Sequence, residues 1–86
     1  MTEHRLKIST DYFIRTKRGN KTAELRYDDR DYMVGDSVVL CEWKSRKKEF
    51  SGREIHKKIS HITWIGQWIK VDPKDGAWCI LHLRDE

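Results

Sequence analysis

The chain has 86 residues, and charged and apolar residues each make up 37% of it, which favours one domain with a small core and a heavily charged surface. Lys and Arg outnumber Asp and Glu by 18 to 14, a balance that permits a polyanionic partner without requiring one. Two cysteines exclude a disulfide framework, and no stretch is apolar enough for a signal peptide or a membrane span, so we expect a cytoplasmic protein without membrane contact.

The first part of the chain predicts a strand followed by a short helix. Residues 4–9 alternate between polar and apolar, with Leu6 and Ile8 turned inward. Residues 9–11, with the sequence Ser-Thr-Asp, offer N-caps for a helix of about two turns, and Gly19 marks its end.

The stretch from Gly19 to Tyr27 groups a lysine, a glutamate and an arginine. In a strand over residues 22–27, Glu24 and Arg26 share one face, and Lys21 lies at the strand's start. The opposite face, which we expect to turn toward the core, carries Ala23, Leu25 and Tyr27. The three charged residues predict a small polar pocket, although the same spacing is common in solvated ion pairs.

Three more strands are expected in the rest of the chain. A turn at Gly35-Asp36 precedes an apolar strand over residues 37–44, and a polar loop covers residues 45–52. A second alternating segment over residues 53–65 places Ile55 and Ile59 on one face and Ile62 and Trp64 on the other. A strong turn signal at residues 72–76 leads to a closing strand over residues 77–84.

This element order predicts a mainly β fold with one or two short helices. About five closely spaced strands without strand–helix–strand alternation favour a small mixed or antiparallel β-barrel with a helix across one side. We expect the single domain to span residues 1–86 and to be a monomer.

Metal binding and cysteine chemistry find little support in the sequence. Zinc ligands cluster at short spacings such as Cys-x-x-Cys, which are absent here. Cys79 and His82 lie three apart on a predicted strand and so face opposite ways, as do His56 and His61. Cys41 lies in an apolar run, which favours a buried structural thiol over a nucleophile. We therefore predict no metal and no other cofactor.

Two surface features leave alternatives open. The first is a basic set, namely Lys17, Arg18, Lys21, Arg46, Lys47, Lys48, Arg53, Lys57 and Lys58. Such a set either binds backbone phosphates, with Phe50 or Trp68 stacking on bases, or is a solvated surface. The second is an apolar patch around Gly66 that contains Trp64, Ile65, Trp68 and Ile69. It either covers the open end of the barrel or contacts a protein partner.

These residues resemble a known family. Residues 19–26 read Gly-Asn-Lys-Thr-Ala-Glu-Leu-Arg and are similar to the Gly-x-Lys-x-x-Glu-x-Arg signature of the ASCH domain, a member of the PUA-like superfamily. Val34-Gly35-Asp36, before an apolar strand, resembles the second signature of that family. Similarity to a small bacterial and phage branch of unknown function extends over residues 4–7, 12–13, 24–26, 29–32, 42–43 and 50–53.

The resemblance implies a PUA-like β-barrel whose first signature lines a cleft beside the helix, and relatives of this type are mostly inferred to bind RNA. One similar enzymatic branch removes the acyl group from N4-acetylcytidine with a Lys-x-x-Thr pair and a downstream glutamate. Here Lys21 matches that pair, but Glu24 stands in place of the threonine. We therefore do not expect the same amidohydrolase chemistry.

The predicted function is binding of RNA or of a modified nucleotide in a Lys/Glu/Arg cleft. Lys21 and Arg26 would engage phosphates or base acceptors, and Glu24 would orient Arg26 or accept from a base amino group. Arg30 and Arg53 are weaker candidates for the rim of this cleft.

Two other function classes stay open. One is a hydrolase acting on a modified nucleoside or on RNA, with Glu24 as general base and Lys21 as its electrostatic or nucleophilic partner. The other is a protein-interaction module that uses Trp64 and Trp68.

Overall fold

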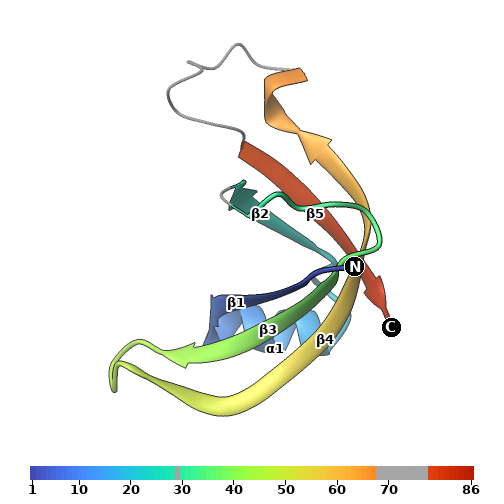
Figure 1. Cartoon of the computed structure of the whole chain (residues 1–86). Helices are drawn as coiled ribbons and strands as arrows, with labels where there is room; N and C mark the ends of the chain where they lie inside the picture. The colour runs from blue at the N-terminus through green and yellow to red at the C-terminus, as the bar shows by residue number, and fades with distance from the viewer. Residues whose placement is uncertain (29, 68–77) are drawn as a thin grey trace.

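A computed structural model of the chain describes residues 1–28, 30–67 and 78–86 (Figure 1). Its elements are β1 (Glu3–Ser9), α1 (Thr10–Lys17), β2 (Ala23–Tyr27), β3 (Ser37–Lys44), β4 (Glu49–Trp64), the short 3-10 helix η1 (Ile65–Gln67) and β5 (Trp78–Asp85). The predicted mainly β fold with short helices is confirmed, and each predicted strand is present. The predicted turn at residues 72–76 lies outside the described residues.

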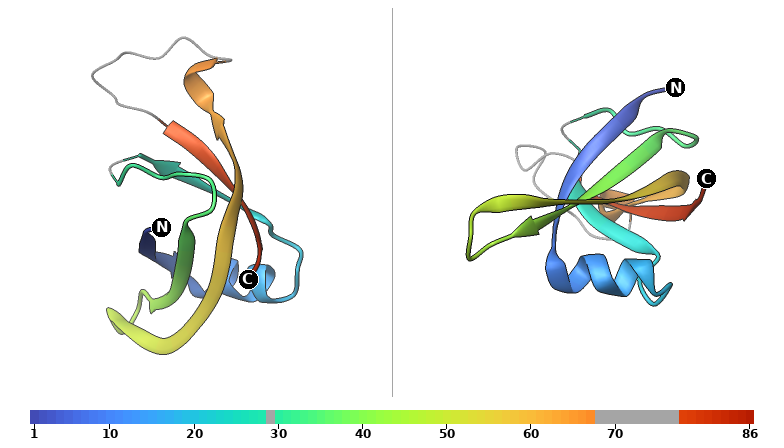
Figure 2. Two further views of the ribbon diagram at one scale, coloured as in Figure 1. Left: turned by 45° about the vertical axis from the view of Figure 1, so that its right-hand side comes forward. Right: turned by 90° about the horizontal axis from the view of Figure 1, so that it is seen from below.

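The five strands form one strongly curled sheet in the order β1-β3-β4-β5-β2. The β1–β3 pair is parallel, and the other pairs are antiparallel. The curl makes a half-barrel whose two edge strands, β1 and β2, turn toward each other (Figures 1 and 2). The mixed sheet agrees with the predicted small mixed or antiparallel barrel. Among the described residues, no helix has the length and apolar character to cross a membrane.

The helix α1 begins and ends where the sequence predicts. The hydroxyl of Ser9 accepts a hydrogen bond from the backbone N–H of Tyr12 at 3.3 Å, which caps the first turn. Gly19 has a φ of +80°, in the left-handed region that ends many helices, and its N–H donates to the carbonyl of Thr16 at 3.1 Å. Phe13 and Thr16 form the buried face of α1, which packs against β1 and β3.

The core fills the concave side of the sheet. Alternate residues of β1, β3 and β5 point into it, as strand geometry requires. Its buried members are Leu6, Ile8, Phe13, Tyr32, Val38, Leu40, Ile59, Cys79, Leu81 and Leu83. Burial of each large apolar side chain contributes about 1.5–3 kcal/mol, so this cluster supplies most of the stabilisation of so short a chain.

The predicted orientation of β2 is wrong. The sequence placed Ala23, Leu25 and Tyr27 toward the core. In the structure Leu25 is 59% exposed, and Glu24 is buried instead. The register explains the inversion, because Glu24 pairs with Leu81 and Arg26 with Cys79, two core residues of β5. Alternation alone favoured the apolar face because it ignores the cations that make burial of Glu24 tolerable.

The strand β4 is longer than predicted and changes face near its middle. It begins at Glu49, inside the predicted polar loop, because residues 45–48 suffice for the turn. Its pairing with β5 shifts between Ile59 and His61, so that Ser60 is an extra residue in a β-bulge. Ile59 lies in the core, and beyond the bulge Ile62 and Trp64 pack against the same core. The single alternation predicted for residues 53–65 therefore fails after residue 59.

The turn predicted at Gly35-Asp36 anchors one end of the half-barrel. Gly35 has a φ of +95°, and the buried carboxylate of Asp36 lies 2.8 Å from Nε2 of His4 on β1. Burial acts to raise the pKa of Asp36, but hydrogen bonds from His4 and from the backbone N–H groups of Thr2 and Met33 outweigh it and lower that pKa. The ionised carboxylate thus ties the start of β1 to the entry of β3.

Candidate functional site

The structure brings together the three residues of the predicted cleft. The ammonium of Lys21 donates to Oε1 of Glu24 and to the carbonyl of Ala23. Nη2 of Arg26 donates to Oε2 of Glu24 at 3.3 Å. Each carboxylate oxygen of Glu24 therefore accepts from one cation, which offsets the cost of burying the charge on the concave side.

The same cluster reaches α1 and holds one donor that lacks an acceptor. The ammonium of Lys21 lies 5.2 Å from the centre of the Tyr12 ring, within cation–π range. Nε of Arg26 is buried without a hydrogen-bond partner within the described residues. A buried polar atom of this kind is rare in folded proteins and calls for an explanation.

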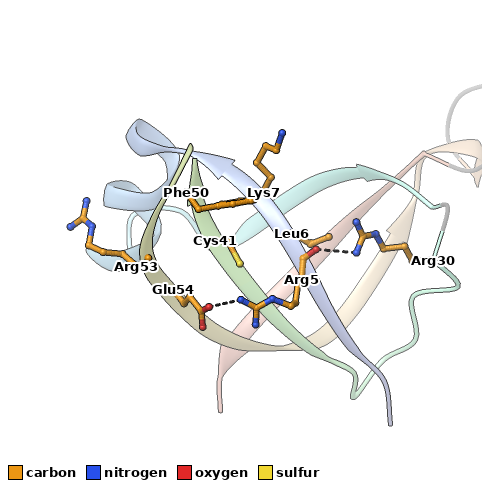
Figure 3. Close-up of a pocket in the computed structure, with 9 residues that line it drawn as sticks. Arg5, Leu6, Lys7, Arg30, Cys41, Phe50, Arg53 and Glu54 are labelled. Atoms are coloured by element: carbon orange, nitrogen blue, oxygen red, sulfur yellow. Dashed lines mark hydrogen bonds and ion pairs between the residues drawn. The ribbon is translucent and has the colours of Figure 1, made fainter. Parts of the chain in front are cut away.

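Two arginines span the gap between the edge strands. Nη2 of Arg26 donates to the carbonyl of Lys7 at 2.8 Å, and Nη1 of Arg30 donates to the carbonyl of Arg5 at 2.9 Å. Both carbonyls belong to β1, the edge strand opposite β2, and Figure 3 shows the Arg30–Arg5 bond. The half-barrel is therefore held closed on this side by guanidinium groups.

Arg53, the other predicted rim residue, is held by a different carboxylate. Its Nε and Nη2 each donate to Glu42 at 2.9 Å, and its guanidinium lies 4.8 Å from the centre of the Phe13 ring. The Arg53 bonds, aided by the hydroxyls of Ser51 and Thr10, lower the pKa of the buried Glu42 carboxyl to about 2. The structure thus places Arg53 with Glu42 and not with the Lys21–Glu24–Arg26 cluster.

A pocket of about 380 Å³ lies along β1, β3 and β4 (Figure 3). Its lining residues are Arg5, Leu6, Lys7, Arg30, Cys41, Phe50, Gly52, Arg53 and Glu54. Two of them, Arg30 and Arg53, were candidates in the sequence. Sequence reasoning missed Arg5 and Lys7, although their positions between the inward residues of the first strand already place them on its outer face.

Two cations of this pocket, Arg5 and Lys7, have different kinds of partner. Nη2 of Arg5 donates to Oε1 of Glu54, a bond that raises the pKa of Arg5 and lowers the pKa of Glu54. The ammonium of Lys7 lies 4.0 Å from the centre of the Trp43 ring. Within the described residues, Lys7 has a π-face as its partner and no carboxylate. Among the residues that the structure describes, its positive charge is therefore not paired with an acid.

The cysteines behave as structural residues. Cys41 and Cys79 are both free and buried, as the sequence predicts. Burial raises the pKa of Cys79 to about 11, so this thiol stays protonated near neutral pH. Among the residues that the structure describes, no three His, Cys, Asp or Glu side chains gather closely enough to hold a metal ion.

The two surface features predicted from the sequence have different outcomes in the structure. Residues 46–48 of the basic set lie exposed in the turn between β3 and β4. In the predicted apolar patch, Trp64 packs against the core, whereas Trp68 and Ile69 fall outside the described residues. The predicted Trp64–Trp68 surface therefore lies in part outside the described residues.

Fold and site together define a small curled-sheet domain whose edge strand is lined by basic side chains. The chain belongs to the family described as a domain of unknown function, DUF3850, whose model matches residues 3–83. It is similar to an uncharacterized 12.9 kDa protein in the GpA 3′ region of Escherichia phage P2, with 34% identity over 67 residues. That match covers 78% of this chain and 60% of the phage protein, so the chain spans well under the full length of this relative.

Proposed function

We propose that this protein is an ASCH-type, PUA-like domain that binds RNA or a nucleotide-sized anion along the edge of β1. The observation that carries the proposal is the convergence of Arg26 and Arg30 on that strand. The two carbonyls that they bind belong to Lys7 and Arg5. Lys7 lies over the ring of Trp43, and Arg5 forms an ion pair with Glu54 in which both side chains stay partly exposed. Four cations along one strand edge suit a phosphate backbone, whose affinity for proteins comes largely from such contacts.

The guanidinium of Arg26 retains donors for a ligand. Its hydrogen bonds within the described residues, to Glu24 and to the Lys7 carbonyl, both use Nη2. A guanidinium carries five N–H groups in a planar fork, and phosphate oxygens accept from two of them at once. Glu24 serves this proposal as an orienting residue, since it fixes the side chain of Arg26 from behind.

The geometry gives the hydrolase alternative no support. A general base must be free to take a proton from the substrate or from water. Both oxygens of Glu24 accept from cations, and the side chain is almost fully buried. Glu24 is therefore better suited to holding Lys21 and Arg26 in place than to proton transfer.

The proposal is tested by the salt dependence of binding to a short single-stranded RNA. We expect Arg30→Gln to weaken binding about tenfold at moderate salt and to lower the slope of log K against log salt by about one, as loss of one phosphate contact requires. Arg84→Gln is the matched control, because Arg84 is an exposed cation on β5, away from β1. Circular dichroism of each variant establishes that it is folded.

Equal losses in the Arg30 and Arg84 variants would contradict the proposal, since they would show that only net charge matters. An unchanged affinity in Arg30→Gln, Arg26→Gln and Lys21→Ala, all folded, would contradict it as well.

A further inference from the structure

The pocket of Figure 3 forms where the short side chain of Cys41 is surrounded by longer side chains. Across the sheet, Cys41 is paired with Lys7 on β1 and with Glu54 on β4. Arg5 belongs to the neighbouring row on one side, and the Trp43–Phe50 pair belongs to the row on the other. The Cys41 side chain is the shortest of this group, so it forms the floor and the longer side chains form the walls.

One wall is aromatic and open to solvent. Phe50 is 54% exposed, and its ring meets Trp43 edge to face with 4.9 Å between the ring centres. An exposed phenyl ring is apolar surface that a planar ligand can cover, and stacking of a base on an aromatic side chain is a general way to hold single-stranded nucleic acid. Lys7, which lies over Trp43, places a cation beside the same wall.

The facing wall carries a donor and an acceptor side by side. Arg5 and Glu54 form an ion pair in which both side chains keep substantial solvent exposure. The edges of nucleobases likewise present hydrogen-bond donors next to acceptors, which arginine and glutamate can bind. A ring that lies against Phe50 therefore meets polar partners across the pocket.

We propose that this pocket holds one unstacked nucleobase-sized aromatic ring that bears an anionic group. Its volume of about 380 Å³ lies within the usual range for small-molecule sites, roughly 300–1,000 Å³. Within the described residues, the partner of Lys7 is the ring of Trp43, so the positive charge of this lining residue favours an anionic ligand. No residue of β2 lines the pocket, but Arg5, Lys7 and Arg30 belong both to its lining and to the proposed contact along β1. The pocket therefore rests on the proposed function and names the part of the ligand that it would hold.

The direct test is an amide NMR titration of the unmodified protein with adenosine 5′-monophosphate and with ribose 5-phosphate, which lacks the base. We expect adenosine 5′-monophosphate to shift the resonances of Lys7, Cys41 and Phe50 saturably, and ribose 5-phosphate to bind about tenfold more weakly because stacking is lost. A short single-stranded RNA is titrated in parallel. Shifts of the same three residues with RNA assign the pocket to a nucleotide within a strand, and shifts with the mononucleotide alone assign it to a free nucleotide.

A pair of variants isolates the aromatic wall. Phe50→Leu keeps an apolar side chain but removes the ring, and we expect it to weaken binding of the mononucleotide about tenfold. Tyr27→Leu is the matched control, because Tyr27 is a 40% exposed aromatic residue of β2 that contacts Trp78 edge to face. This control is expected to leave the affinity unchanged.

The pocket proposal fails if adenosine 5′-monophosphate and ribose 5-phosphate bind equally well, or if Phe50→Leu and Tyr27→Leu bind the mononucleotide alike. Each of these results leaves the salt-dependent role of Arg30 intact, so failure of the pocket is distinguishable from failure of the proposed RNA contact.

Discussion

Both faces of the half-barrel carry ion pairs between carboxylates and basic side chains, but the pairs on the two faces differ in burial. On the concave side, the carboxylates of Glu24 and Glu42 are 7% and 1% exposed and are bound by Lys21, Arg26 and Arg53. On the outer side, Glu54 is 34% exposed and pairs with Arg5. The buried carboxylates are enclosed by the cations that bind them, whereas the exposed pair lines a pocket that a ligand can enter.

The difference follows from solvation. An ion pair in water contributes little, because solvent and salt already stabilise both charges. A buried carboxylate without its cation has neither water nor a partner, so its loss of pairing is costly. The comparison therefore predicts that inner variants change stability and outer variants change binding.

The largest expected effect is that of Glu24→Ala. This substitution leaves Lys21 and Arg26 partly buried without their shared carboxylate, and we expect it to lower the free energy of unfolding by about 3–5 kcal/mol. Urea denaturation measures the loss. Glu54→Ala on the outer face should unfold at nearly the same urea concentration as the unsubstituted protein. Similar losses in the two variants would overturn the distinction between the faces.

A slightly smaller effect tests the orientation of β2. Leu81→Ala, in the core, should lower the free energy of unfolding by about 2–5 kcal/mol, since it removes buried methyl groups and opens a cavity. Leu25→Ala, on the exposed side of the paired strand, should change it by at most about 0.5 kcal/mol. Thermal and urea unfolding of both variants measure the difference. A large loss of unfolding free energy in Leu25→Ala would contradict this orientation, because it would mean that Leu25 faces the core as the alternation in the sequence predicts.

Acid should remove the contribution of the inner pair at Glu42. Hydrogen bonds from Arg53 and then from Ser51 lower the pKa of Glu42 from its ordinary value of 4.5 to about 2. Because the folded-state pKa is the lower one, this contribution is fully present above about pH 4.5 and is lost as the pH falls toward 2. Melting temperatures across this range should therefore decline less steeply in Glu42→Gln.

The control for this pH series is Glu49→Gln, which alters an exposed glutamate at the start of β4. It should keep the steep acid decline of the unsubstituted protein. If Glu42→Gln declines as steeply as this control, the Arg53–Glu42 pair does not govern acid stability.

Local signals in the sequence predicted the elements well, and the structure shows why they predicted the faces less well. The helix ends were readable because Ser9 and Gly19 act through their immediate neighbours. The inward turn of Glu24 depends on Lys21, Arg26 and the pairing with β5, which no local alternation contains. The face change in β4 depends on one extra residue, Ser60, and nothing in the local sequence marks this residue as a β-bulge.

In the candidate site, too, contacts between residues close in sequence were predictable, and contacts made by strand pairing were not. Lys21, Glu24 and Arg26 meet because they are close in sequence at the start of one strand. Arg5 and Lys7 join Phe50 and Glu54 only through the parallel pairing of β1 with β3 and the long return of β4. Sequence reasoning had no access to those pairings, and it therefore named Arg30 and Arg53 of this pocket but not its other cations.

The central claim is that a nucleic-acid ligand lies along β1 and is held by more than net charge. A two-dimensional amide NMR titration with a short single-stranded RNA, at low and at high salt, tests it most directly. We predict shifts at Lys7, Arg26 and Arg30 that persist at high salt. Shifts spread over residues 46–48 and 53–58 that vanish with salt would contradict the claim, because they would report counterion release at exposed charges alone.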